Sequence, residues 1–469
     1  MLSVWSRRLV PLVLALGLTH CGGTDPDSQP PAPETASSEA EMRSSCPRAR
    51  LVEDINEGLE PSSIANLTDV NGKLFFTADD GEHGVELWKS NGTRGGTRLV
   101  KDITPGAASS AIRELTEVNG KVFFAVGSEL WKSDGTERGT VRLATFESEF
   151  ADVFPRNLFE YRGKLVFEGF DEEHGMELWV SDGTSRGTRL LLDFNPGPES
   201  SDPSDFVELD GDLVFEVFDE AALTVKLVKL EDWRRVVELA DLGDESSVRR
   251  TLVVGHRLFI YYTDEGDPTI AVTTGRPGTF RDLFRTRRFG VTGVRDLVAL
   301  EGKVYFQVGS ALWVTDGTEA GTRLVKDVLP DSGVDKVLLF LTVLSNQLYF
   351  SADDGMAGRE LWISDGTEGG TQLFADLNPG PTSSSPTDLL NVHNSKLFFA
   401  ADDGVHGREP WKLHRGGTPE FLMDIAPGMA SSSPRGFIRS DEDIFFAADD
   451  GRRGEELWAT PKEHNDCHR

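Results

Sequence analysis

One short segment is written five times in this chain with few changes. The copies are ELWKSNGTRGGT from Glu86, ELWKSDGTERGT from Glu129, ELWVSDGTSRGT from Glu177, ALWVTDGTEAGT from Ala311 and ELWISDGTEGGT from Glu360. A second pattern, two apolar residues followed by Phe or a similar residue, recurs nine times from Leu74-Phe75-Phe76 to Ile444-Phe445-Phe446. Eight steps over the 370 residues from Phe76 to Phe446 give a period of about 46. This period predicts a repeat architecture built from one copied unit.

Each unit contains four short strand patterns. In the first unit they cover 65–70, 73–78, 85–90 and 98–103, and Asn71-Gly72 forms a tight hairpin turn between the first two. Four antiparallel strands at this period are typical of a β-propeller blade. The sequence therefore predicts an all-β, closed propeller with nine blades. Residues 202–291 match the repeat poorly, with Val228 and Ala271 in place of Trp, so eight blades plus an irregular insertion is the alternative.

The two ends of the chain predict how the ring closes. Residues 50–55 match a fourth strand that has no first three before it, and Glu456-Leu457-Trp458 is a third strand with no fourth after it. We expect the N-terminal strand to complete the last blade, which removes exposed sheet edges. Cys46 and Cys467 flank these two strands, so we predict a Cys46–Cys467 disulfide, with two free thiols as the alternative.

The first residues have a different character. Arg7 and Arg8 precede a short apolar run, which is typical of a signal peptide over 1–20. The run ends at Cys21 in a segment that resembles a bacterial lipobox, although His20 departs from the small residue expected there. We predict lipidation of Cys21, a flexible tether over 21–45 and a propeller over 46–469. The alternative is an ordinary secretory signal that is cut elsewhere; both place the protein outside the cytoplasm.

The charge excludes some partner classes. The formal net charge is −30, and such an acidic surface repels nucleic acid and anionic lipid. We therefore expect no nucleic-acid partner and membrane contact through the lipid anchor only. The expected state is a monomer at the outer membrane or cell surface, with protein or glycan partners there.

The quoted repeats resemble the bacterial ELWxxDGT repeat proteins, which are exported proteins often labelled hyalin-like. The resemblance covers about residues 46–460. It implies a surface or secreted location and propeller-type β structure. It implies no established chemistry and no catalytic residue that could be carried over to this chain.

The repeated DGT turn is predicted to be structural. Its first position holds an Asx residue, which can accept a hydrogen bond from its own backbone two residues on, and its glycine supplies a positive φ. These Asx residues are Asn91, Asp134, Asp182, Asp316 and Asp365.

A second turn groups carboxylates, a ligand type that Ca²⁺ prefers. The candidate ligands are Asp79, Asp80, Asp353, Asp354, Asp402, Asp403, Asp449 and Asp450. The spacing matches no known calcium loop, and an Asp-Gly hairpin needs no ion, so Ca²⁺ is a hypothesis only. The repeated histidines of this turn, His83, His174 and His406, are expected to be exposed and not catalytic.

One region departs from both the repeat and the charge. Residues 249–295 contain nine arginines and four acidic residues, a net charge of +5. Arg and Tyr are favoured at interfaces, so we predict partner or anionic-glycan binding here. The residues are Arg285, Arg287, Arg288, Tyr261 and Tyr262. The alternatives are neutral drift or pairing of the arginines with acidic neighbours.

These observations favour an extracytoplasmic, lipid-anchored propeller that acts as a binding or structural module. No HExxH, GxSxG, CxxC or phosphate-loop motif is present, so the sequence names no catalytic residue. Two alternatives remain open. One is a glycan-active hydrolase or lyase that uses the central channel, and the other is a calcium-stabilised surface adhesin.

Overall fold

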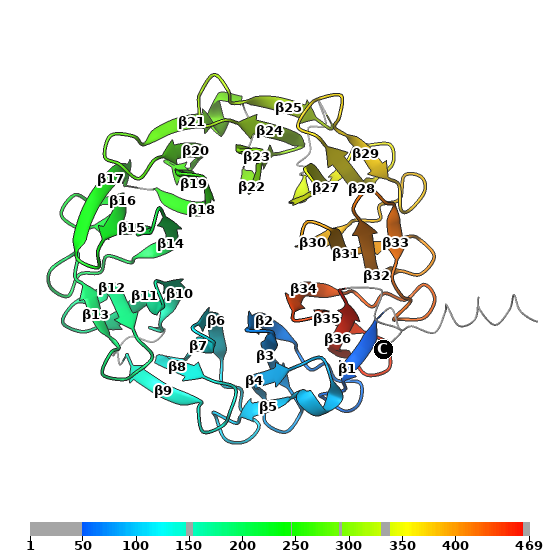
Figure 1. Cartoon of the computed structure of the whole chain (residues 1–469), viewed down its shortest axis with the longest axis horizontal. Coiled ribbons are helices and arrows are strands. Elements are labelled where there is room, and N and C mark those ends of the chain that lie inside the picture. The colour runs from blue at the N-terminus through cyan, green and yellow to red at the C-terminus, as the bar shows by residue number, and fades with distance from the viewer. Residues whose placement is uncertain (1–48, 147–152, 245, 290–292, 330–337, 463–469) are drawn as a thin grey trace, which may run out of the picture. The chain divides into compact units, whose positions relative to one another are not determined.

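The computed structural model describes residues 49–146, 153–244, 246–289, 293–329 and 338–462, within the compact unit Pro47–Arg469. Its strands form nine four-stranded antiparallel sheets that follow one another around a ring (Figure 1). The nine-bladed propeller is therefore confirmed, and the alternative of eight blades with an insertion is wrong. Blades 4 and 5, which have lost the sequence motif, keep all four strands.

Each blade runs from an inner first strand to an outer fourth strand (Figure 1). Blade 1 consists of β2 (Ala65–Val70), β3 (Lys73–Asp79), β4 (Val85–Ser90) and β5 (Arg98–Lys101). Blade 2 consists of β6 (Ile112–Val118), β7 (Lys121–Val126), β8 (Glu129–Ser133) and β9 (Val141–Thr145). Blade 3 consists of β10 (Arg156–Tyr161), β11 (Lys164–Asp171), β12 (Gly175–Ser181) and β13 (Arg189–Leu192).

The next three blades include the sector that matches the repeat poorly. Blade 4 consists of β14 (Ser204–Leu209), β15 (Asp212–Asp219), β16 (Thr224–Glu231) and β17 (Arg235–Gly243). Blade 5 consists of β18 (Ser247–Val254), β19 (Arg257–Asp264), β20 (Asp267–Thr273) and β21 (Arg281–Arg285). Blade 6 consists of β22 (Val294–Leu300), β23 (Lys303–Val308), β24 (Ala311–Thr315) and β25 (Arg323–Asp327).

The last three blades return to the regular repeat. Blade 7 consists of β26 (Leu339–Leu344), β27 (Gln347–Asp353), β28 (Arg359–Ser364) and β29 (Gln372–Ala375). Blade 8 consists of β30 (Thr387–Val392), β31 (Lys396–Asp402), β32 (Arg408–His414) and β33 (Pro419–Phe421). Blade 9 consists of β34 (Arg435–Ser440), β35 (Asp443–Asp449), β36 (Glu455–Pro461) and β1 (Arg50–Glu53).

Ring closure pairs the two ends of the described chain. Strand β1 lies antiparallel to β36, with Arg50 opposite Ala459 and Leu51 opposite Trp458. The strand ends at Glu53, two residues earlier than predicted. The reason is local: the backbone amides that follow, at Ile55 and Asn56, donate to a carboxylate on β36 and not to its backbone.

The hydrophobic core lies in the seams between blades. Side chains alternate along a strand, so successive residues of each second strand face opposite neighbouring blades. Phe76 packs with Phe445 and Leu457 of blade 9, while Phe75 packs with Phe124 of blade 2. All four phenylalanines are at most 2% exposed. The repeated Leu-Phe-Phe pattern is thus the element that joins each blade to both neighbours.

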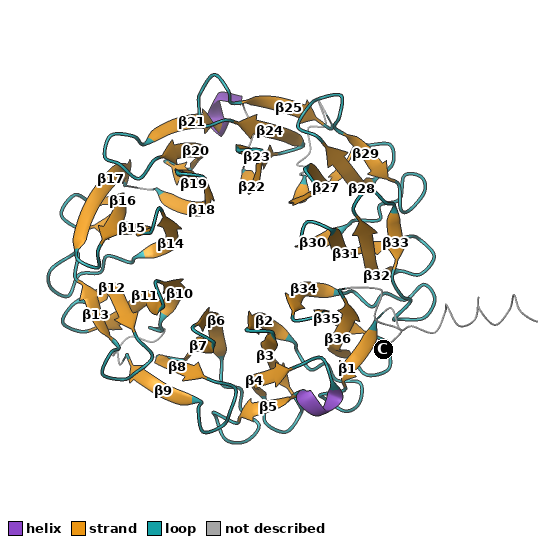
Figure 2. Cartoon of the chain, in the orientation of Figure 1, coloured by secondary structure: helices purple, strands orange, loops and turns teal. Residues whose placement is uncertain are grey.

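The antiparallel order gives the ring two chemically different faces. The turns between second and third strands and the loops between blades lie on one face, here called the loop face. The turns between first and second strands and the DGT turns lie on the opposite turn face. The only helices in the described residues are the short 3₁₀ segments η1 (Arg94–Gly96) and η2 (Thr286–Phe289) (Figure 2). No helix in this part of the chain is long and apolar enough to cross a membrane.

Candidate functional site

The DGT turns are closed by their own side chains. Asp134 Oδ1 accepts hydrogen bonds from the backbone N–H of Thr136, at 2.9 Å, and from its hydroxyl, at 2.7 Å. Ser133 Oγ lies 2.7 Å from Thr140 Oγ1 across the base of the turn. The copies at Asp182, Asp316 and Asp365 repeat the aspartate contacts. The motif's polar groups are therefore engaged within the turn, as the sequence predicts.

The same turns also join neighbouring blades. Lys89 of blade 1 donates from Nζ to the carbonyl oxygen of Gly135 in blade 2, and Lys132 donates likewise to Gly183 in blade 3. Gly135 has a φ of +85°, and a Cβ there would lie 2.9 Å from Phe75 of blade 1. A side chain would therefore meet both an unfavourable backbone conformation and the neighbouring ring. The glycine allows the two blades to approach.

The glutamate of the ELW motif has a role that the sequence did not reveal. Glu86 is fully buried and accepts hydrogen bonds from the Ser110 hydroxyl, from Ile103 N at 3.1 Å and from Thr104 N at 3.3 Å. It therefore fixes the loop to the next blade, which we call a glutamate lock. Equivalent locks form at Glu177, Glu360, Glu409 and Glu456. The signal in the sequence was a Glu sixteen or seventeen residues before a loop amide, as at Glu86, Glu177, Glu360 and Glu409, followed by a Ser-rich segment.

Burial is the main reason why the pKa values of the glutamates in these locks are raised. It raises the pKa of Glu177 and of Glu456 to about 7, because the charged form loses hydration. The hydrogen bonds that each carboxylate accepts act in the opposite direction and only partly offset this effect. The pKa values of Glu86, Glu360 and Glu409 are raised for the same reason.

The predicted calcium ligands are engaged in turns. Asp79 accepts the N–H of Gly81 at 2.8 Å, and Asp80 accepts the N–H groups of Glu82 and His83. His83 Nδ1 lies 2.8 Å from the second oxygen of Asp80. The turns at Asp353-Asp354, Asp402-Asp403 and Asp449-Asp450 repeat the backbone contacts. Within the described ranges no three His, Cys, Asp or Glu side chains lie together as a metal site.

The calcium hypothesis can be tested by removing Ca²⁺ with a chelator. If Ca²⁺ stabilises these turns, a chelator should lower the melting temperature by several degrees, because a ligand that binds only the folded state stabilises it. The hydrogen bonds above need no ion, and on that basis we expect no change with chelator. Thermal unfolding with and without EDTA distinguishes the two outcomes. The matched control is Asp353→Asn, which keeps a turn acceptor and lowers the charge.

The sector that departs from the repeat lacks the glutamate lock. Blades 4, 5 and 6 carry Lys226, Thr269 and Ala311 at the register position of the ELW glutamate. Lys226 forms ion pairs with Asp219 at 2.8 Å and Glu238 at 3.1 Å instead. In blade 2, Glu129 accepts a hydrogen bond from Trp131 Nε1 at 2.8 Å and pairs with Arg142, so its ELW glutamate is also used differently. Blades 4, 5 and 6 differ from it in having no glutamate at this position.

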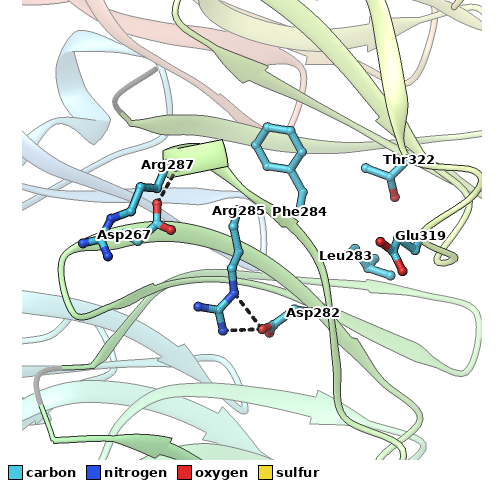
Figure 3. Close-up of a pocket in the computed structure, with 8 residues that line it drawn as sticks. All are labelled: Asp267, Asp282, Leu283, Phe284, Arg285, Arg287, Glu319 and Thr322. Atoms are coloured by element: carbon cyan, nitrogen blue, oxygen red, sulfur yellow. Dashed lines mark hydrogen bonds and ion pairs between the residues drawn. The ribbon is translucent and has the colours of Figure 1, made fainter. Parts of the chain in front are cut away.

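A hollow of about 770 Å³ lies on the outer side of this sector, between blades 5 and 6. Its lining residues are Asp267, Asp282, Leu283, Phe284, Arg285, Arg287, Glu319 and Thr322. Figure 3 shows the two arginines of the β21–η2 segment on one side and Glu319 and Thr322, from the DGT turn of blade 6, on the other.

Hydrogen bonds hold the arginine side of the hollow in place. Asp267 is 6% exposed and accepts the Thr286 hydroxyl at 3.0 Å and the backbone N–H of Arg287 at 2.8 Å. Arg285 pairs with Asp264 at 2.6 Å. It also pairs with Asp282 at 2.6 Å (Figure 3). These two carboxylates raise the pKa of Arg285, through its hydrogen bond to Asp282 first. Arg285 is therefore held mainly by its own blade.

The other predicted partner-binding residues fall in three environments. Arg287 is exposed, and its guanidinium has a 3.4 Å contact to the Glu265 carbonyl. Tyr262 is only 3% exposed and donates its hydroxyl to Asp282 at 2.8 Å, while Tyr261 is half-buried against the core. Neither tyrosine lines the hollow. The Arg288 side chain lies outside the described residues.

Three more arginines of this region connect blade 5 to blade 6. Arg250 pairs with Asp296 at 3.2 Å, Arg257 donates to the Gly302 carbonyl at 3.1 Å, and Arg281 donates to the Gly317 carbonyl at 2.6 Å. For these three arginines, the contacts favour the alternative that the positive charge is used to hold neighbouring blades together and not to bind a partner. Cys21, Cys46 and Cys467, the predicted lipidation and disulfide positions, lie outside the described residues.

No known protein family and no curated protein sequence matches the chain. Among solved structures it is similar to the computationally designed Ika8 protein, with a TM-score of 0.44 and 18% identity over 76% of this chain and 100% of that one. It is also similar to a puromycin hydrolase, with a TM-score of 0.39 and 14% identity over 75% and 61%. A Mycobacterium tuberculosis puromycin-hydrolyzing peptidase gives 0.39 and 12% over 74% and 59%. The chain spans about three fifths of the two hydrolases, and likenesses at this level carry no argument about function.

Proposed function

We propose that this chain is an exported, lipid-anchored propeller that acts as a binding module, and that the hollow between blades 5 and 6 contacts its partner. The rigid ring supplies the scaffold, and one altered sector supplies the specificity. The proposal of export and lipidation rests on the signal-like segment over 1–20 and on Cys21.

One observation carries the choice of surface. The repeated motifs are engaged in turn closure, blade joints and glutamate locks, so they are not free to define a ligand. One side of the hollow lies where the repeat is lost and contains the exposed Arg287 beside the buried Asp267. A charged, positioned arginine at the edge of a hollow is typical of binding surfaces. The partner that fits is a cell-surface protein or glycan with an anionic group.

Arg287→Ala tests this proposal. The Arg287 backbone N–H still donates to Asp267 in the variant, so the hollow keeps its shape while the exposed charge is lost. We expect at least a tenfold loss of the principal cross-linked partner when the purified chain is incubated with cell-surface fractions and captured. Arg138→Ala, an exposed change in the DGT turn of blade 2, is the matched control. An unchanged partner profile for Arg287→Ala would refute the assignment of the hollow.

A further inference from the structure

The innermost strands carry a second positive feature that is separate from the hollow. These strands contact one another in sequence around the whole ring, from β2 through β34 and back to β2. All nine run in the same direction, so their first residues lie together at the loop face. In blades 2, 3, 5 and 6 arginines stand among the first four residues of these strands. The members are Arg113, Arg156, Arg249, Arg250 and Arg295, here called the arginine collar.

The collar breaks the symmetry of the ring. Blades 1, 4, 7 and 8 begin their inner strands with Ala65, Ser204, Leu339 and Thr387 and carry no arginine there. Blade 9 begins with Arg435, but that side chain is held by both carboxylate oxygens of Glu455, at 2.5 and 2.8 Å. The exposed arginines are therefore grouped on one arc of the ring and not distributed by the repeat.

Two collar arginines have no ion-pair partner in the part of the chain that the structure describes. These are Arg249 and Arg295, and both are exposed. The other three are positioned: Arg113 lies 4.8 Å above the Phe154 ring, Arg156 lies 2.7 Å from Glu168, and Arg250 pairs with Asp296. Arg249 and Arg295 thus place two exposed positive charges on this arc of a chain whose net charge is −30.

Hydrogen-bonding groups alternate with these arginines in the same register. Next to the first residues stand Glu114, Asn157, Asp205 and Asp296. The second strands of blades 3, 4 and 6 carry Glu168, Glu216 and Gln307 where blades 2, 8 and 9 carry alanine. Gln307 is 1% exposed and neither amide atom has a partner in the described structure. Blades 3, 4 and 6 therefore carry large polar groups on their second strands at this end of the ring.

Burial lowers the negative charge that these acids contribute. It raises the pKa of Glu168 and of Glu216 to about 7, and the pKa of Asp205 is also raised. Such carboxyls hold a proton at higher pH and can donate a hydrogen bond to a hydroxyl.

We propose that the arginine collar is a binding site for a carboxylate-bearing saccharide, with arginines on its carboxylates and the interleaved polar groups on its hydroxyls. Arginine matches carboxylate geometry in a bidentate manner. The interleaved Glu114 and Asp296 accept hydrogen bonds from hydroxyls but repel the closely spaced charges of a polyphosphate chain. The alternation of arginines with carboxylates therefore favours binding of a uronate over binding of a nucleic acid.

Oligogalacturonate is the probe, and its binding to the full chain is measured by isothermal titration calorimetry. We expect Arg249→Ala/Arg295→Ala to weaken binding at least tenfold and to reduce its dependence on salt, because two charged contacts are lost. Within the described residues Arg295 forms no ion pair, so Arg295→Ala alone should leave the melting temperature unchanged. Arg249 lies close enough to Asp205 and Glu216 to lower the pKa of each, so the melting temperature of the double variant is measured together with its binding. Arg138→Ala/Arg186→Ala, two exposed changes in DGT turns, is the matched control and should bind normally.

Three outcomes would overturn the proposal. They are absence of oligogalacturonate binding by the wild-type chain, equal binding by the collar variant, and equal binding of a neutral oligosaccharide. A single-stranded oligonucleotide that binds the collar as tightly would replace the saccharide with a phosphate ligand and so also refute it. The collar variants leave Arg287 unchanged, so the proposal for the collar and the proposal for the hollow can be refuted independently.

Discussion

Glu456→Ala is expected to lower the free energy of unfolding by about 3 kcal/mol, because it leaves two buried donors without their acceptor and a third, half-buried donor with the Ser62 hydroxyl oxygen only. The donors are the Ser62 hydroxyl and the backbone amides of Ile55 and Asn56. Glu456 lies on β36, whereas its partners lie about 400 residues earlier, directly after β1. The variant therefore weakens the one glutamate lock that fixes the N-terminal segment to the last blade.

Glu86→Ala is the matched control, because Glu86 forms the same lock with Ser110, Ile103 and Thr104 inside a continuous stretch of chain. Both variants lose similar hydrogen bonds, but only Glu456→Ala loosens the closure. Urea unfolding should show a larger loss for Glu456→Ala, and small-angle scattering should show an expanded ring before global unfolding. Equal losses and equal dimensions for the two variants would show that closure depends on β1–β36 pairing alone.

The protein is expected to be more stable at about pH 5 than at about pH 8, by more than about 1 kcal/mol in the free energy of unfolding. Burial raises the pKa of Glu168, Glu177, Glu216 and Glu456 from 4.5 to about 7. Between these values the folded chain binds more protons than the unfolded chain. The stability that protonation provides is therefore complete below pH 4.5 and is lost as the pH rises towards 7.

A second set of groups limits this trend at low pH. Hydrogen bonds from Thr136 and Thr184 lower the pKa of Asp134 and Asp182 below 3.8, so their contribution is lost as the pH falls below that value. Stability should therefore be greatest in mildly acidic solution. Urea unfolding over this pH range measures it, and Glu177→Gln should flatten the slope because the amide does not titrate. A slope of the opposite sign would contradict the assignment of raised pKa values.

The fold was predictable because its signals are local and repeated. The Leu-Phe-Phe pattern counts the second strands, and the Asn71-Gly72 type of turn places the first hairpin. Even blade 5, which has Ala271 in place of Trp, keeps its apolar β19 fully in the core. The motif was lost there while the alternating apolar pattern was retained, and that pattern determines the strands.

The candidate sites were only partly predictable, since they depend on contacts between distant segments. The arginine-rich region was visible in the sequence, but the pairing of Arg285 with Asp264 and Asp282 was not. Tyr262 is buried because side chains alternate along β19, and its side chain faces the seam between blades 4 and 5. Arg249, Arg250 and Arg295 fell within the arginine-rich region that the sequence showed, but their grouping with Arg113 and Arg156 of blades 2 and 3 depends on the closed ring and was missed.

The pairing of β1 with β36 has a consequence for how the molecule folds. Blades 1 to 8 each use neighbouring hairpins, so their contacts form over short loops and can develop one after another. Blade 9 cannot be completed until its last hairpin meets the segment at Arg50–Glu53 that precedes all the others. Until then β36 is an unpaired sheet edge, which can pair with a strand of a second chain. Refolding at high protein concentration should therefore favour strand-exchanged dimers, with final ring closure as the slow step.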